Sequence, residues 1–470
     1  MIEHALRRRD GGAGPGADAV GSLAARLRGA AVGPADPAYD GARTIYNAMH
    51  AGRRPGLIVQ AADVADVIAA VTFARDHDLA LAVRGGSHNV TGFSTCDDGL
   101  VLDLKRMKGI RVDTARGTVR AEGGVTWGDM DHATHPFGFA VPGGVVSTTG
   151  IAGLTLGGGM GHLTRRGGLS CDNLVSADMV LADGRFVTCD AEHEPELFWA
   201  IRGGGGNFGV VTAFEYRAQQ VSSVLGGPVF YRPDPAVFRA WEALLADAGT
   251  DLQALFAFTM APAAPFLPEA WHGKAVMAVV ACWSGAESED ARIAAALGGL
   301  GEVIGQALWR MPYPQINTLF DGALPYGMQH YWRANVVHDV PDAALAAHIE
   351  HGARTPHPAS GTFLFPIDGA CHRLRPGDTA FPHRTARYSV IFSGSWPDPA
   401  DNDANTAWVK AYETALRPYS EAGGYINFMS DADDMRVRAN YGANHARLRA
   451  AKTKYDPHNL FRLNQNILPA

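Results

Sequence analysis

A histidine stands just past the end of a predicted strand, after two glycines, in the stretch RGGSHNVTGF from Arg84 to Phe93. The apolar run LALAV before Arg84 predicts the strand. An imidazole nitrogen is a good nucleophile near neutral pH because its reference pKa is about 6.5. Gly85 and Gly86 allow the backbone to approach a ligand closely, since glycine has no Cβ. His88 is therefore a candidate for chemistry on a bound ligand, although taken alone it is more simply a hydrogen-bonded loop residue.

Two further stretches are rich in glycine, PGGVVSTTGIAGLTLGGGMG (Pro142 to Gly161) and RGGGGNFG (Arg202 to Gly209). Loops with exposed backbone N–H groups cradle phosphates. A single cluster of this kind is equally explained as a tight turn. Three clusters in one region predict a cofactor that carries a pyrophosphate.

The third loop contains Gly204-x-Gly206-x-x-Gly209, which matches the dinucleotide-binding pattern. That pattern requires a strand before it and a helix after it. Here the helical stretch ELFWAIR comes first and the strand-like VVTAFEY follows, which is the reverse order. The sequence therefore disfavours an NAD-dependent dehydrogenase.

The first half of the chain alternates strands and helices. The strand GLIVQ is followed by a helix with Val64, Val67, Ile68 and Val71 on one face, and then by LALAVR. A strand–helix–strand unit favours a parallel pair. The strands GLVLDL, IRVD and TVRAEGG follow, and Asp183-Gly184 predicts a hairpin turn. These elements predict a cofactor domain over residues 41–220.

The sequence pattern changes near residue 221, where longer strand candidates appear. They include LQALFAFTM, KAVMAVVACW, GTFLFPI and RYSVIFSGSW. Asp234 and Pro235 are predicted as the N-cap and first residue of a helix. We expect a second α+β domain, with a mostly antiparallel sheet covered by helices, over residues 221–415. The segment 416–470 reads as a strand, GGYINFMS, then a helix, and then a coil that DPHNLF anchors with apolar residues.

Composition excludes several classes of protein. The net charge is −7 and basic residues form no stripe, so nucleic acid and anionic membranes are not expected as partners. No apolar run is long enough to span a membrane. Residues 1–40 are expected to be a frayed leader and a helix, and they lack the apolar core of a secretory signal. His132 and His135 lack the companion ligands of a metal site.

The five cysteines are far apart and none forms a CxxC pair, which disfavours a disulfide framework or a zinc site and makes the cytoplasm the default location. They are Cys96, Cys171, Cys189, Cys282 and Cys371.

Five stretches in this order resemble the berberine bridge enzyme-like flavoprotein oxidases of the vanillyl-alcohol oxidase superfamily. They are RGGSHNVTGF, PGGVVSTTGIAGLTLGGGMGHLTRRGGLSCDNL, LFWAIRGGGGNFGVVTAFEY, GGYINF and YDPHNLFRLNQNI. The resemblance covers residues 40–467 and is sparse in the middle, where TAFPHR matches. It implies the PCMH-type FAD-binding fold, which consists of two α+β subdomains, a substrate domain and a C-terminal segment that returns to the cofactor.

The resemblance implies that His88 is bonded covalently to the 8α-methyl group of FAD. The doubly linked members carry a cysteine where Val146 stands, so we expect a single link. The implied cofactor-binding residues are Arg84, Gly85, Gly86, Ser87, His88, Asn89, Gly92, Val146, Ser147, Thr149, Gly150, Gly153, Gly157, Gly159, Gly206, Gly209, Val211, Tyr425, Asn427, Asn464 and Asn466.

The tyrosine of the family's Tyr-x-Asn motif corresponds to Tyr425 and implies a catalytic base. Strand alternation would send Tyr425 and Asn427 to the same face. A tyrosine with its reference pKa of about 10 needs a neighbour to help it accept a proton, and the sequence does not show that neighbour. The candidates for lining the substrate pocket, which are equally explained as core residues, are Tyr331, Trp332, Arg333, His383 and Arg384.

The function implied is an FAD-dependent oxidase. It would remove a hydride from an alcohol or related small molecule of the natural-product class and pass the electrons to O2 to give hydrogen peroxide. One alternative is a flavin-dependent oxygenase of a polyketide or similar intermediate, and another is a flavin-binding protein without activity. An oxygenase is distinguished by the incorporation of labelled O2 into product. A non-catalytic protein is disfavoured by Tyr425 and Asn427.

Overall fold

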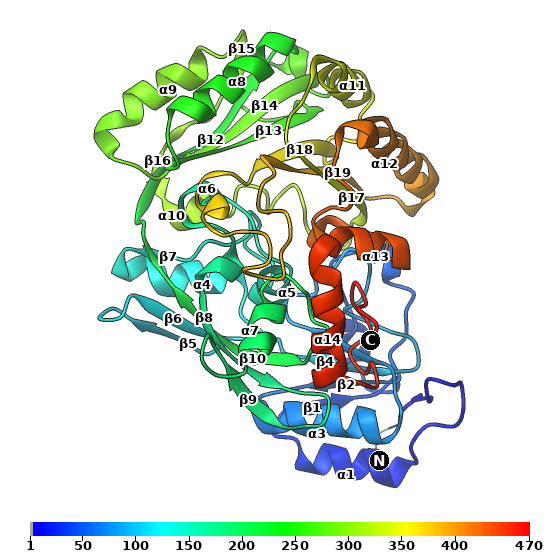
Figure 1. The fold of residues 1–470 in the computed structure, drawn as a ribbon. Coiled ribbons are helices and arrows are strands. Elements are labelled where there is room, and N and C mark those ends of the chain that lie inside the picture. The colour runs from blue at the N-terminus through cyan, green and yellow to red at the C-terminus, as the bar shows by residue number, and fades with distance from the viewer. Residues whose placement is uncertain (1–2) are drawn as a thin grey trace.

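The computed structural model describes residues 3–470, which form three larger β-sheets and one short two-stranded ribbon (Figure 1). The ribbon pairs β7 (Phe139–Ala140) with β11 (Gln219–Gln220). The predicted α+β class is confirmed, with most strand pairs antiparallel. The predicted divisions at residues 40, 220 and 415 stay a proposal.

The first sheet has the order β1 (Ala30–Val32), β2 (Leu57–Gln60), β4 (Leu100–Asp103) and β3 (Leu81–Arg84). The strands β2 and β3 are parallel, as predicted, but β4 lies between them and pairs with both. Helices α1 (Ala17–Arg26) and α3 (Val64–Asp76) pack on one face. The other face packs against α2 (Tyr39–Ala42). His88 follows the end of β3, so this sheet fixes where its loop begins.

The second sheet is antiparallel, in the order β5 (Ile110–Asp113), β6 (Thr118–Glu122), β10 (Val210–Arg217), β8 (Leu174–Val180) and β9 (Phe186–Cys189). The hairpin predicted at Asp183-Gly184 joins β8 to β9, and Gly184 has a φ of +86°. Helix α7 (Pro195–Ile201) precedes the third glycine-rich loop and β10 follows it, so the reversed order that disfavours a dinucleotide fold is confirmed. The helices α4 (Trp127–Thr134), α5 (Ile151–Leu156) and α6 (Thr164–Gly167) complete this part.

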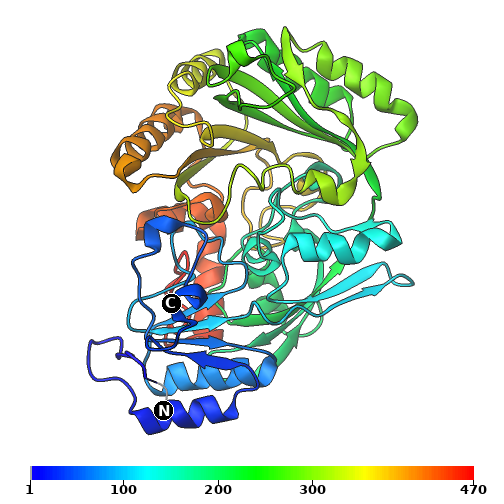
Figure 2. The same ribbon diagram turned by 180° about the vertical axis from the view of Figure 1, so that it is seen from behind.

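The third sheet is also antiparallel and holds the strands predicted in residues 221–415. Its order is β15 (Val303–Gln306), β12 (Ser223–Tyr231), β14 (Ala275–Trp283), β13 (Leu252–Met260), β18 (Gly361–Pro366), β19 (Tyr388–Trp396) and β17 (Gln329–Val337), and β16 (Trp309–Pro312) pairs with β12. The short helix α10 (Tyr313–Ile316) follows β16. Figures 1 and 2 show one face covered by α8 (Pro235–Asp247), α9 (Asp290–Gly298), α11 (Asp342–Gly352) and α12 (Asn402–Leu416). Asp234 caps α8 as predicted, accepting a hydrogen bond from the Ala236 N–H.

Alternation along these strands sorts their side chains between two environments. Phe256 and Phe392 pack among the covering helices. Their neighbours Leu255 and Ile391 point to the opposite face, toward the first half of the chain. The sheet thus carries a helix-packed core on one side and the roof of a cavity on the other.

The N-terminal segment is ordered, which corrects the expectation of a frayed leader. The Ala5 N–H donates to the Gly56 carbonyl at 3.1 Å, and the Arg7 N–H donates to the Asp98 carbonyl at 2.8 Å. Leu6 is buried beneath them in the core of the first sheet. The apolar residue and the backbone bonds together hold this segment down.

The strand predicted for GGYINFMS is wrong, because Ile426–Phe428 form a single 3-10 turn. Gly423 has a φ of +87°, and the Gly424 N–H donates to the Asn440 side chain at 3.0 Å instead of to a neighbouring strand. A Cβ at Gly424 would lie 2.4 Å from the Ala334 carbonyl oxygen of β17. The glycines therefore bend the chain beneath the third sheet.

The tail continues through α13 (Asp434–Tyr441) and α14 (His445–Tyr455), and α14 runs back beside α7 (Figure 1). The Lys452 ammonium group, fully buried, donates to Asp456 at 2.7 Å and to the Asn207 and Phe461 carbonyls at 2.7 and 3.0 Å. Asp456 also accepts from the backbone N–H groups of Leu460 and Phe461. This buried ion pair ties the end of the chain to the third glycine-rich loop.

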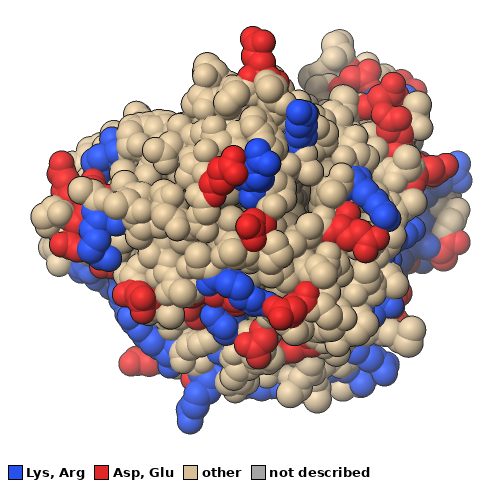
Figure 3. Space-filling view, turned by 90° about the horizontal axis from the view of Figure 1, so that it is seen from above, with Lys and Arg blue, Asp and Glu red and all other residues tan. Residues whose placement is uncertain are grey.

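The surface over the helices of the third sheet carries basic and acidic side chains close to one another (Figure 3). Arg239 of α8 pairs with Glu242 and with Asp342 of α11, each at 2.7 Å. Within residues 3–470, no helix is long and apolar enough to cross a membrane.

Replacing Lys452 with methionine leaves the Asp456 carboxylate buried without its partner. Breaking one side of a buried ion pair costs about 3–5 kcal/mol, and we expect a loss of that size in the free energy of unfolding, measured in urea. The control is Lys454→Met, which removes an exposed pair with Glu194 and should cost less than about 1 kcal/mol. Equal losses in the two variants would contradict the anchoring role.

Candidate functional site

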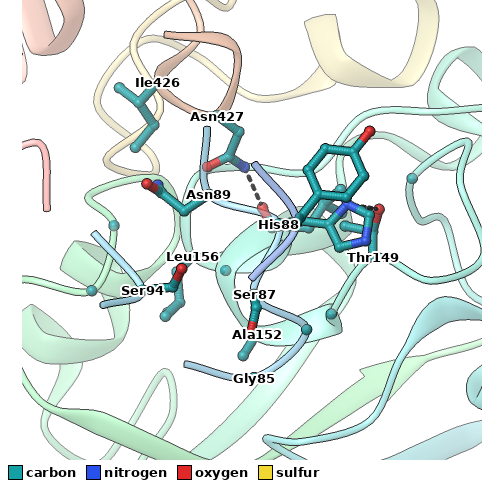
Figure 4. A pocket seen from close by; sticks show the side chains of 18 of the residues that line it. Gly85, Ser87, His88, Asn89, Ser94, Thr149, Ala152, Leu156, Ile426 and Asn427 are labelled. Atoms are coloured by element: carbon teal, nitrogen blue, oxygen red, sulfur yellow. Dashed lines mark hydrogen bonds between the residues drawn. The ribbon is translucent and has the colours of Figure 1, made fainter. Parts of the chain in front are cut away.

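A cavity of about 280 Å³ lies between the three glycine-rich loops, the tail and the inner face of the third sheet. Figure 4 shows the first loop, with Ser87 and His88, beside Thr149 and Ala152 of the second loop. Ile426 and Asn427 of the tail enter from the other side. Segments far apart in the sequence therefore meet around one space.

The first two loops touch through glycine backbones. A Cβ on Gly86 would lie 2.2 Å from the Gly150 nitrogen, and one on Gly150 would lie 2.4 Å from the Gly86 nitrogen. A Cβ on Gly85 would lie 2.6 Å from the Gly123 carbonyl oxygen. These distances admit no side chain, so glycine is required for the loops to approach each other.

His88 is held on both its edge and its face. Its Nε2 lies 2.9 Å from the Thr148 hydroxyl, and its Nδ1 lies 3.3 Å from the Thr149 hydroxyl. The ring of Tyr46 stacks between the imidazoles of His88 and His330, with centroid distances of 4.0 and 4.3 Å. The stack and the two threonines fix the plane of the His88 ring.

Burial lowers the pKa of His88 to about 3, and the neighbouring His330 and Lys105 add to the effect. Desolvation disfavours the charged form of an imidazole. His88 is therefore neutral across the physiological range, with a nitrogen lone pair available for bonding.

Tyr425 lies fully buried in the wall of the cavity, and its hydroxyl oxygen accepts two hydrogen bonds. The donors are the Gly159 N–H at 2.9 Å and the Asn427 amide at 2.8 Å. Burial raises the pKa of Tyr425 above its ordinary value, whereas these two donors lower it because they favour the phenolate. Asn427 is itself held by the Leu154 carbonyl and packs against Gly157, where a Cβ would lie 2.4 Å from its amide oxygen.

The cavity brings together most of the residues predicted from the sequence. Those that line it are Arg84, Gly85, Gly86, Ser87, His88, Asn89, Val146, Thr149, Gly150, Gly153, Gly206, Gly209, Val211, Tyr425, Asn427 and Asn464. Five predicted residues lie outside the lining, namely Gly92, Ser147, Gly157, Gly159 and Asn466.

Those five act behind the wall or away from it. Gly157 and Gly159 support Asn427 and Tyr425 as described above. Ser147 turns outward, where its N–H donates to the Asp321 carboxylate at 2.9 Å. Gly92 packs against the ring of His50. Gln465, for which the sequence indicates no role, lines the cavity in place of Asn466.

One nitrogen of the Arg84 guanidinium group is occupied by the protein itself. Its Nη2 atom pairs with Asp103 at 2.7 Å, and both side chains are buried. The two residues end the paired strands β3 and β4, so the ion pair closes the edge of the first sheet.

Among the pocket candidates from residues 221–415, Trp332 alone lines the cavity. The other four pair with acidic side chains: Tyr331 and Arg333 with Asp431, His383 with Glu421, and Arg384 with Asp172. Alternation along β17 explains the split between Tyr331 and Trp332, since neighbours on a strand face opposite sides.

Several residues that shape the site carry no recognisable signal in the sequence. Tyr46 lies in a connection without a pattern, and Ser94 lies in an ordinary loop. Phe363 belongs to a predicted strand, but alternation along that strand does not say which of its two faces lines the cavity. The sequence predicts a strand at Phe428, and this strand does not form.

Comparison with known proteins gives the cofactor. Residues 55–190 match the family model described as FAD binding domain, and residues 424–468 match the one described as Berberine and berberine like. An FAD-linked oxidoreductase of Dictyostelium discoideum is 34% identical over 423 residues, covering 88% of this chain and 89% of its own. The chain belongs to the berberine bridge enzyme-like FAD-linked oxidoreductases.

Two further relatives agree with this family. The (R)-6-hydroxynicotine oxidase of Paenarthrobacter nicotinovorans is 30% identical over 455 residues, covering 94% of this chain and 97% of its own. The crystal structure of 6-hydroxy-D-nicotine oxidase from Arthrobacter nicotinovorans superposes with a TM-score of 0.81 at 28% identity, covering 94% of this chain and 98% of its own. The PCMH-type fold expected from the resemblance is confirmed.

The cavity of this berberine bridge enzyme-like protein fits FAD because several buried polar groups around it have no partner within the protein. Among the described residues, the hydroxyls of Ser87 and Ser94 and the Nε and Nη1 atoms of Arg84 are buried without a protein partner. Buried polar groups are normally hydrogen-bonded, so these atoms call for a ligand. Gly153 faces the cavity, and a Cβ there would meet no protein atom within 4 Å.

Replacing Gly153 with alanine tests where FAD lies. Alanine is the better helix former by about 1 kcal/mol, and the new methyl group clashes with no protein atom, so the fold should not weaken. The methyl group would project into the space assigned to FAD. We expect the ratio of bound flavin to protein, measured by absorbance, to fall severalfold.

The matched control is Gly21→Ala, at an exposed position inside α1 with equally free space. It should leave the flavin content unchanged. A full complement of flavin in Gly153→Ala would show that the cofactor does not approach this helix.

Proposed function

We propose that the protein is an oxidase with FAD attached through one covalent bond to His88. It removes a hydride from an alcohol or a related small molecule, which is a natural product, and O2 receives the electrons to give hydrogen peroxide. The observation that carries this proposal is that His88 and Tyr425 enter one cavity, each held by two polar partners. Bound FAD supplies the hydride acceptor.

The state of His88 supports the covalent bond. A neutral imidazole has the lone pair that a bond to the 8α carbon of FAD requires. The stack with Tyr46 limits rotation of the ring, and the threonine hydroxyls lie beside both nitrogens. Val146 lines the same wall and has no nucleophilic atom, which supports a single bond.

Denatured wild-type protein should keep its yellow colour on the polypeptide, and His88→Ala should lose it. Because the pKa of His88 is about 3, its neutral fraction is nearly complete above pH 5. Attachment of FAD to apoprotein, followed by in-gel flavin fluorescence, should therefore keep a constant rate from pH 5 to pH 8. With an ordinary histidine, the rate of attachment would instead fall about tenfold per pH unit below the histidine pKa of about 6.5.

The surface variant His193→Ala serves as the control and should keep the attached flavin. Release of the flavin from denatured wild-type protein would refute the bond to His88, while the FAD-binding cavity would stand. A rate that falls steeply below pH 6.5 would refute the neutral state of the ring.

We propose that Tyr425 accepts the hydroxyl proton of the substrate. The Gly159 N–H and the Asn427 amide both donate to the Tyr425 hydroxyl oxygen, and both favour the phenolate. Because burial keeps the pKa above about 10, the phenolate is a minor form at pH 7, and its population rises tenfold per pH unit. The proton-accepting form of Tyr425 therefore becomes more abundant as the pH increases.

Tyr425→Phe should lower the rate of anaerobic flavin reduction by substrate about 100- to 10,000-fold, as expected for loss of a positioned base. In stopped-flow measurements from pH 7 to pH 9, the wild-type rate should rise with pH and the variant rate should stay flat. Reoxidation by O2 needs no substrate proton and should change little.

Tyr412→Phe is the matched control, since Tyr412 is equally buried and its hydroxyl donates to the His348 carbonyl among the outer helices. Its reduction rate should equal that of the wild type. A near wild-type rate in Tyr425→Phe would eliminate Tyr425 as the base.

A further inference from the structure

Five aromatic side chains line the part of the cavity under the third sheet: Phe320, Trp332, Phe363, Phe365 and Phe428. They form linked pairs. Phe428 lies 5.3 Å from Phe365 and 6.4 Å from Trp332 between ring centroids, and Phe320 lies 6.1 Å from Phe363 at 89°. We refer to these five residues as the aromatic wall.

The aromatic wall meets the proposed base directly. The ring of Phe428 stands edge-to-face with that of Tyr425, at 4.8 Å and 86°. Both lie at the turn that replaces the predicted strand, and they place the aromatic wall next to the ring of Tyr425, which lines the same cavity. A ligand packed on this wall therefore lies beside Tyr425.

The cavity lacks a free charge. None of the described residues that line it is Asp, Glu or Lys, and Arg84 is neutralised by Asp103. His88 is uncharged at neutral pH because burial lowers its pKa to about 3. Transfer of an unpaired ion from water to such a site is costly, so the cavity selects against charged substrates.

The part of the cavity under the third sheet also has few polar groups. The Ser393 hydroxyl lies 3.5 Å from the Ser395 hydroxyl, and the Trp332 indole N–H donates to that same Ser395 oxygen at 3.4 Å. A sugar carries several hydroxyls, and each one buried without a partner costs about 1–3 kcal/mol. The cavity offers Ser393 and Tyr425 for one or two such groups, and apolar surface for the rest.

We propose that the substrate is a neutral aromatic alcohol, whose ring packs on the aromatic wall while its hydroxyl faces Tyr425. This inference rests on the oxidase function proposed above and specifies its substrate class. The alcohol would lose a hydride from carbon to bound FAD and a proton from oxygen to the Tyr425 phenolate, and become a carbonyl compound. O2 would then take up the two electrons together with two protons, one from the hydride carried by FAD and one from Tyr425, and leave as hydrogen peroxide.

The experiment titrates the flavin-loaded protein, without O2, with four probes and follows the flavin absorbance. The probes are 2-naphthylmethanol, its 6-carboxylate and 6-trimethylammonium derivatives, and D-glucose. We expect the neutral alcohol to bind at least tenfold more tightly than each of the other three. Binding perturbs the flavin spectrum whether or not turnover follows, so this readout does not require catalysis.

Two variants locate the binding. Phe363→Ala removes one ring of the aromatic wall and should weaken binding of the neutral probe about tenfold, as is typical when an aromatic anchor of a binding site is truncated. Ser393→Ala keeps the volume of the site and should weaken binding of the same probe about two- to tenfold, because one hydrogen bond is lost. The control is Phe137→Ala, at an exposed phenylalanine outside the cavity, which should bind the probe normally.

Three outcomes would overturn the substrate class: tighter binding of a charged probe or glucose, no response to 2-naphthylmethanol at its solubility limit, or unchanged affinity in both Phe363→Ala and Ser393→Ala. An unfolded Phe363→Ala would leave the comparison to Ser393→Ala. Failure of the oxidase proposal has a different signature, since the protein would then lack bound flavin, or its reduced flavin would not return electrons to O2.

Discussion

The contact between Gly86 and Gly150 is the constraint on which the site depends. Each residue lies where a Cβ would overlap the backbone of the other. This contact brings the end of a strand in the first sheet against a loop of the second, and so places His88 beside Thr148 and Thr149. Any larger residue would separate the loops and open the wall of the cavity. The glycines therefore shape the cavity by contacting each other as well as by leaving room for a ligand.

A second constraint is the alternation of the third sheet. Each strand has one apolar set for the covering helices and another for the cavity, so the same strands that make the core also make the roof. The tail closes the arrangement from below, because the buried Lys452–Asp456 pair holds it to the third glycine-rich loop. Tyr425 and Asn427 are thereby delivered to the cavity from a segment far along the chain. The contacts that hold the tail in place therefore also position Tyr425 and Asn427 in the cavity.

The elements that a local rule decides could be predicted from the sequence. Strand and helix order, the Asp183-Gly184 turn and the Asp234 cap all follow from local patterns, and the glycine-rich loops line the cavity. The features that distant contacts decide could not be predicted. The chain bends at Gly423 and Gly424, where a strand was expected, because β17 passes close by. The N-terminal segment is held by hydrogen bonds to Gly56 and Asp98, and no local pattern reveals these bonds. The direction of Ser147 and the stack of Tyr46 on His88 likewise depend on partners distant in sequence.

The central claim is that the wall formed by the two touching loops binds FAD and that His88 holds it by the single bond. The most direct measurement is peptide mapping by mass spectrometry of the denatured, protease-digested protein. The account predicts one flavin-bearing peptide, which contains residues 85–93 and carries the added mass on His88. A flavin adduct on any other residue, or none on that peptide from yellow protein, would contradict it.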